Sequence, residues 1–158
     1  MLRTIFTALL LLQSSLISAQ EPITPADSPI IIYQADSTFD DVKMNLELAI
    51  SDRGMLITNT LHVSQMLERT AKDTGKGDKL YEMAESLEFC SVIMSYRMSS
   101  AHPANLSICP LTVSIYTKVG APDTTYVSYR QPKMLGDAAA VTADLTKLLD
   151  DIVREAVE

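Results

Sequence analysis

Two cysteines are the side chains of this 158-residue sequence whose type and placement most directly suggest chemistry. Cys90 follows the apolar Phe89 and precedes Ser91, and Cys109 is followed by Pro110. In an oxidising compartment two such thiols can form a disulfide, and a thiol pair can also hold a soft metal. The residues leave three possibilities open, which are a Cys90–Cys109 disulfide, two buried free thiols, and a redox or metal site.

The environment expected around Cys90 favours reactivity. Ser91 is a good N-cap for a helix running to about Ala101, which places Cys90 where a strand ends and a helix begins. Backbone N–H groups and the helix dipole there favour a thiolate. His62 is expected in the turn before the second helix, where it could be a general base beside Cys90, an axial haem ligand or a solvated turn residue. Cys90, Cys109 and His62 are therefore the candidate redox or ligand site.

Three methionines and two arginines are secondary candidates. Met94 and Met98 lie four residues apart on one expected helix and could bind a soft metal together. Methionines at this spacing also commonly pack in the hydrophobic core. Met66 is a further possible ligand. Arg69 and Arg130 could bind an anionic ligand or pair with nearby carboxylates. No Cys-x-x-Cys-His motif occurs, which excludes covalent c-type haem, and the sequence identifies neither a metal nor a cofactor.

The first 19 residues have the pattern of a secretory signal peptide. Arg3 is followed by an apolar run over residues 5–12 and then by small residues, with Ser18-Ala19 before Gln20. The run is too short for a membrane anchor, so we expect cleavage after Ala19, no stable membrane span afterwards, and a periplasmic or secreted protein. Residues 20–29 contain three prolines and are expected to be a flexible lead-in.

The remaining chain, residues 30–158, has the length of one domain. The formal net charge of the full sequence, −7, argues against nucleic acid as a partner, because an acidic chain repels a phosphate backbone. Asp150 and Asp151, on the polar side of the last helix, are expected to be solvated charges.

Apolar periodicity predicts the elements in the order strand 30–35, helix 39–53, strand 55–61, helix 64–74, strand 81–89, helix 91–101, strand 109–116, strand 125–130 and helix 138–156.

The order β-α-β-α-β-α-β-β-α, with short connections, predicts a single two-layer α+β domain. Its mixed or antiparallel sheet is expected to be covered by helices on one face. We expect no internal repeat, because no period recurs along the chain.

Several short motifs together resemble the bacterial family known as domain of unknown function 302. The motifs are Met66-Leu67-Glu68-Arg69-Thr70, Lys72-Asp73, Leu87-Glu88-Phe89-Cys90-Ser91, Cys109-Pro110 and Tyr129-Arg130-Gln131-Pro132. The resemblance extends from about Phe39 to Val157. It implies a compact two-layer α+β domain that is dimeric and exported, and it brings no established activity.

The sequence therefore supports three hypotheses about function. The first is an exported, homodimeric binding domain, not an enzyme, for a small molecule or a redox partner near Cys90, Cys109 and His62. The second is a thiol-based redox protein working through Cys90 and Cys109, with sulfur metabolism as a possible setting. The third is a metal- or haem-binding protein that uses His62 with methionine or cysteine ligands.

Overall fold

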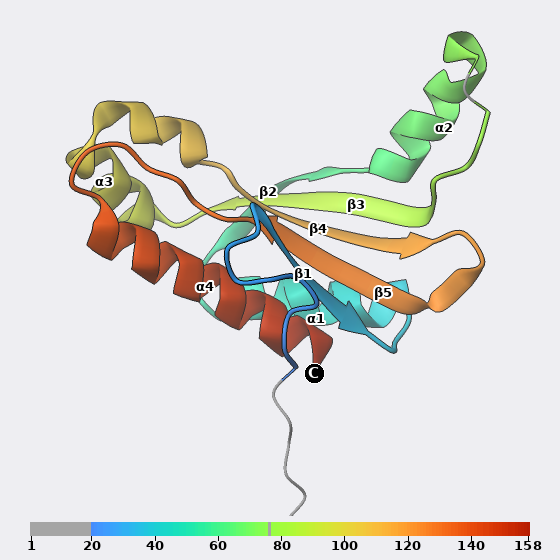
Figure 1. Ribbon diagram of the computed structural model, residues 1–158, viewed down its shortest axis with the longest axis horizontal. Coiled ribbons are helices and arrows are strands. Elements are labelled where there is room, and N and C mark those ends of the chain that lie inside the picture. Colours follow the sequence, from blue (N-terminus) through green and yellow to red (C-terminus); the bar gives the residue numbers. More distant parts are fainter. Residues whose placement is uncertain (1–19, 76) are drawn as a thin grey trace, which may run out of the picture.

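The computed structural model describes residues 20–75 and 77–158, so the expected signal peptide at residues 1–19 lies outside the described residues. Five antiparallel strands form one open sheet with helices on one face, as expected for an α+β domain (Figure 1). The elements are β1 (Ile30–Ala35), α1 (Phe39–Ser51), β2 (Leu56–Leu61), α2 (Val63–Thr74), β3 (Tyr81–Cys90), α3 (Val92–Ala101), the 3₁₀ helix η1 (Pro103–Ile108), β4 (Leu111–Lys118), β5 (Ala121–Arg130) and α4 (Ala139–Val157).

The strands lie in the order β1-β5-β4-β3-β2, and every neighbouring pair is antiparallel. Leu56 pairs with Cys90, and Ile30 pairs with Arg130. These residues, with the start of β4 at Leu111, mark one end of the sheet, which we call the cysteine end. At the opposite end β2 leads into α2, which projects away from the sheet (Figure 1). We call this the arm end.

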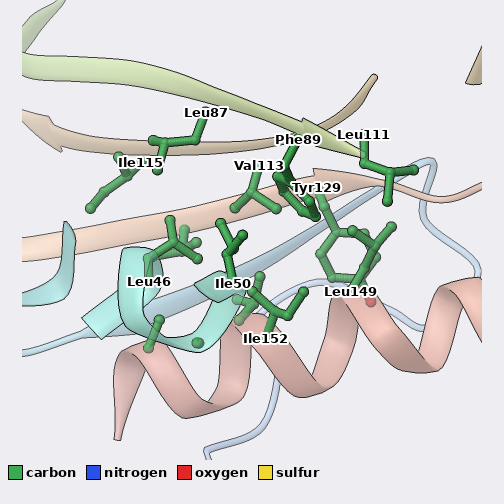
Figure 2. Close-up of a cluster of buried hydrophobic side chains, with 14 of the residues drawn as sticks. Leu46, Ile50, Leu87, Phe89, Leu111, Val113, Ile115, Tyr129, Leu149 and Ile152 are labelled. Carbon is green, nitrogen blue, oxygen red and sulfur yellow. The ribbon is translucent and has the colours of Figure 1, made fainter. Parts of the chain in front are cut away.

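Helices α1 and α4 cover one face of the sheet because each carries an apolar stripe. Leu46 and Ile50 of α1 and Ile152 of α4 are fully buried against Phe89 of β3 and Ile115 of β4 (Figure 2). In β4 the buried residues alternate with half-buried ones, as expected when one face of a sheet lies against the core. The predicted two-layer arrangement is confirmed.

Side-chain caps set two helix starts as the sequence predicts. The backbone N–H of Asp41 donates to Thr38 Oγ1 at 3.3 Å at the start of α1. The N–H of Met94 donates to Ser91 Oγ, also at 3.3 Å, at the start of α3. A hydroxyl acceptor there satisfies a backbone donor that the helix itself leaves unpaired.

Three local details differ from the sequence expectation. Helix α2 begins at Val63, one residue before the predicted start at Ser64, and has no side-chain cap, while the Ser64 hydroxyl lies near the carbonyl of Ala84. The strict alternation expected in β3 is interrupted by a bulge between Tyr81 and Met83, because an extra residue moves later side chains to the other face. The segment 103–108, for which the sequence predicts no helix or strand, forms η1.

Candidate functional site

The two cysteines lie together at the cysteine end of the sheet. Their Sγ atoms are 2.12 Å apart, at disulfide distance, and their Cα atoms are 6.1 Å apart. Cys90 is the last residue of β3, and Cys109 follows η1 and precedes β4. Both are half-buried. The prediction that the two cysteines are close enough to interact is confirmed. When the disulfide forms, it closes a covalent loop that contains α3 and η1.

A cavity of about 380 Å³ lies beside the cysteine pair. Its volume falls within the range typical of small-ligand sites. The two chain neighbours of Cys109, Ile108 and Pro110, line it together with the ends of β1 and β5 and one side chain of α4. The full lining is Pro29, Ser107, Ile108, Pro110, Leu111, Thr112, Arg130, Gln131, Pro132, Lys133 and Leu149.

Hydrogen bonds hold the walls of this cavity in place. The N–H of Gln131 donates to the carbonyl of Pro29 at 3.0 Å, which continues the pairing of β1 with β5 beyond Arg130. On the other side, the buried Asn105 of η1 accepts the N–H of Leu135 at 2.9 Å and donates to the carbonyls of Leu135 and Met98, at 3.1 and 3.0 Å. The amide of Asn105 thus ties η1 to both α3 and the chain that follows β5.

Asn105 is a structural residue that the sequence does not reveal as such. Its only sequence signal is the Asn105-Leu106-Ser107 pattern of a glycosylation acceptor, which would be unused if the protein is bacterial, as the family resemblance implies. In the structure its side chain is buried and both ends of its amide are hydrogen-bonded. An interior amide that meets its hydrogen-bonding needs in this way specifies the packing of the surrounding chain.

His62 lies at the arm end, away from the cysteines. Its Nδ1 is 2.9 Å from Glu85 Oε1, and the other oxygen of this carboxylate is 2.7 Å from Lys43 Nζ. The hydrogen bond to Glu85 raises the pKa of Lys43. Glu85 and Cys90 are five residues apart on β3, a span of about 17 Å in a strand, so the structure does not bring His62 together with either cysteine.

The secondary candidates are divided between the two ends. Met66 and Arg69 lie on α2 at the arm end, whereas Met94, Met98 and Arg130 lie near the cysteine end. Met98 is fully buried in the core, and the half-buried Met94 packs against the core. Within residues 20–75 and 77–158, no group of three or more His, Cys, Asp or Glu side chains is placed to hold a metal ion.

Asp150 is a half-buried hydrogen-bond acceptor, not the solvated charge that the sequence suggests. The hydroxyls of Tyr33 and Tyr129 both donate to its carboxylate, and Arg154 Nε donates to it at 2.7 Å. Burial alone would raise the pKa of Asp150, but the hydrogen bonds from Arg154 and the tyrosines hold it below its ordinary value. The expectation is wrong because the two tyrosines come from β1 and β5, far from Asp150 in sequence.

Comparison with known families identifies the fold that carries this site. The model of the family described as domain of unknown function DUF302 matches residues 31–157, nearly all of the described chain. The chain belongs to the DUF302 family. The matched residues include the cysteine pair and every residue that lines the cavity except Pro29. No curated protein matches the chain.

A solved structure of another DUF302 protein has a similar fold. It is the crystal structure of an uncharacterized conserved DUF302 protein from Bacillus stearothermophilus, with 18% sequence identity and a TM-score of 0.66. The similarity covers 81% of this chain and 98% of the Bacillus chain. At this identity the likeness establishes the fold, and function must be argued from the site.

Proposed function

We propose that this DUF302 domain binds a small ligand in the cavity at the cysteine end of its sheet. The observation that supports the proposal is the cavity itself, which has the size of a small-ligand site and a lining of six apolar and five polar or charged residues. Its walls come from β4, β5, η1 and α4 and from the chain that adjoins β1 and β5, so these elements hold it open.

Binding rather than catalysis is the activity that this lining supports. None of the lining residues is a histidine, cysteine, aspartate or glutamate, so the hydroxyls of Ser107 and Thr112 have no histidine or carboxylate in the lining to activate them as nucleophiles. His62, the candidate base, is held by Glu85 at the opposite end of the sheet. We therefore propose a binding domain without hydrolase or transferase chemistry.

A ligand screen on the purified domain tests this proposal. Thr112, which lines the cavity, is replaced by Trp to fill the cavity. The matched control is Thr124→Trp, because Thr124 is also half-buried and lies on the same face of the sheet, but near the arm end. Ligands found by saturation-transfer NMR with the wild-type protein should be lost with Thr112→Trp and kept with Thr124→Trp. Ligands that survive Thr112→Trp would place the binding site elsewhere and contradict the proposal.

The second candidate function, a thiol-based redox protein, is favoured by one observation, the half-buried pair Cys90 and Cys109 at disulfide distance. Mass measurement after alkylation, with and without reductant, reads the state of the pair in exported protein. We expect a two-dalton deficit that reductant removes. A redox titration then separates the functions, because a structural disulfide has a reduction potential below about −300 mV and a redox-active one a higher potential.

We also propose that the domain is exported after removal of residues 1–19 and forms a homodimer. The structural support for a dimer is α2, an amphipathic helix that projects from the sheet and packs mainly against β3 (Figure 1). No helix among the described residues is long and apolar enough to cross a membrane. N-terminal sequencing of exported protein should begin at Gln20, and light scattering after size exclusion should give twice the chain mass.

A further inference from the structure

The charged groups at the cavity have one sign. Arg130, at the end of β5, and Lys133, three residues later, both line it, and none of the described lining residues is acidic. This is unusual in a chain that carries 20 acidic and 13 basic residues. Two cations facing one cavity without a carboxylate create a local positive potential, which a partly enclosed site strengthens.

The other cations of the described chain are mostly neutralised by the protein. Ion pairs with carboxylates are formed by Lys43, Arg53, Lys79, Arg97, Lys147 and Arg154. Lys118 lies over the ring of Tyr126, 4.2 Å from its centroid. Arg130 and Lys133 form no ion pair with any described residue. Glu88, a carboxylate with which Arg130 could have paired, accepts a hydrogen bond from Asn59 instead. The cavity cations are therefore available to a ligand.

The remainder of the cavity is suited to an apolar group. Leu111 and Leu149 contribute to its lining and belong to the end of the core next to Tyr129 (Figure 2), and three prolines and Ile108 complete the apolar surface. The hydroxyls of Ser107 and Thr112 add hydrogen-bonding groups to this lining. Such a site would hold a ligand with an apolar body of several carbon atoms and one charged end.

We propose that the ligand is a small organic carboxylate whose carboxylate group is bound by Arg130 and Lys133 and whose apolar body lies against Leu111 and Leu149. The planar guanidinium group of an arginine matches the two oxygens of a carboxylate, and the lysine adds a second positive charge. This inference rests on the proposed function, since it names the ligand class for the same cavity.

The test uses hexanoate. Hexanamide is its uncharged counterpart, and acetate has the same carboxylate group without the long apolar body. Each is titrated into the mature protein and followed by ¹H–¹⁵N NMR. We expect hexanoate to shift the backbone signals of residues 107–112 and 130–133. We expect hexanamide and acetate each to bind at least about tenfold more weakly, the factor that 1.4 kcal/mol produces. Higher salt should weaken hexanoate binding.

Variants assign the charge recognition to the two cations. Arg130→Gln and Lys133→Gln should each weaken hexanoate binding about fivefold or more without changing the affinity for hexanamide. Arg69→Gln, which removes an exposed arginine of α2 at the arm end, should change neither affinity. Equal binding of hexanoate and hexanamide, no binding of hexanoate, or unchanged hexanoate affinity in both variants would each overturn the carboxylate proposal.

A failure of the carboxylate proposal can be distinguished from a failure of the proposed small-ligand site. Uncharged ligands that bind the wild-type protein and are lost with Thr112→Trp would keep the cavity as the binding site while refuting the carboxylate class. Hexanoate that binds equally well to Thr112→Trp would show a site elsewhere, and both proposals would then fail.

Discussion

Replacing Asp150 by Ala should destabilise the domain by about 2–3 kcal/mol. The change removes the acceptor of two tyrosine hydroxyls and the partner of Arg154. Tyr33 and Tyr129 are 0% and 3% exposed, and an unsatisfied buried polar group costs about 1–3 kcal/mol. The Asp150 side chain is 28% exposed, so water can partly replace the lost carboxylate as an acceptor. The loss should therefore cost about 1 kcal/mol for each of the two tyrosine hydroxyls, the lower end of this range. The partly exposed ion pair adds up to about 1 kcal/mol.

Asp151→Ala is the matched control for this prediction. Asp151 is the next residue of α4 and pairs only with the exposed Lys147, four residues earlier. Both substitutions replace Asp by Ala in the same helix, so the gain in helix propensity cancels between them. Asp151→Ala should therefore cost no more than about 0.5 kcal/mol, the value of an exposed pair at this spacing.

Urea unfolding monitored by circular dichroism measures both variants and a double-mutant cycle. In the background of Tyr33→Phe, one hydroxyl no longer needs the carboxylate, so Asp150→Ala should cost about 1 kcal/mol less than in the wild type. Equal free energies of unfolding for Asp150→Ala and Asp151→Ala would refute the reasoning. So would additive effects of Asp150→Ala and Tyr33→Phe, because they would show that the hydroxyl and the carboxylate do not interact.

Three further predictions concern stability. The folded-state pKa of Asp150 is lowered. The difference in free energy of unfolding between wild type and Asp150→Asn should therefore be largest above about pH 4 and decrease as the pH falls below this value. Urea unfolding from pH 7 to 2.5 measures this difference. Leu145→Asp should unfold the domain, since this fully buried side chain has no partner for a charge; a native circular dichroism spectrum would contradict this. Gly120 and Gly136 both have positive φ, but only at Gly136 would a Cβ lie 2.4 Å from the carbonyl oxygen of Ala101, so Gly136→Ala should lower the melting temperature more than Gly120→Ala.

Local patterns predict most of the fold because the helices and strands are amphipathic in themselves. The apolar stripe of α4 and the alternation in β4 each identify a buried face without reference to the rest of the chain. The caps at Thr38 and Ser91 are equally local. The bulge after Tyr81 is not predictable in this way, because it depends on how β3 pairs with β4.

The candidate site could be predicted only in part. Cys90 and Cys109 are recognisable because few residue types carry their chemistry, and the short connection through α3 and η1 returns the chain to the strand next to β3. His62 is recognisable by type, but its place beside Glu85, which lies five residues along β3 from Cys90, follows from strand register. Lys133 carries no sequence signal, since its role depends on a cavity that distant segments enclose. The tertiary contacts of Asp150 are hidden for the same reason.

Mapping bound ligand on the structure tests the central claim most directly. Crystals of the mature protein soaked with hexanoate should show its density in the cavity between β4, β5 and α4, with the carboxylate within about 3 Å of Arg130 and Lys133. Density for the ligand at the arm end, between α2 and β3, with an empty cavity at the cysteine end, would contradict the assignment of this cavity as the binding site.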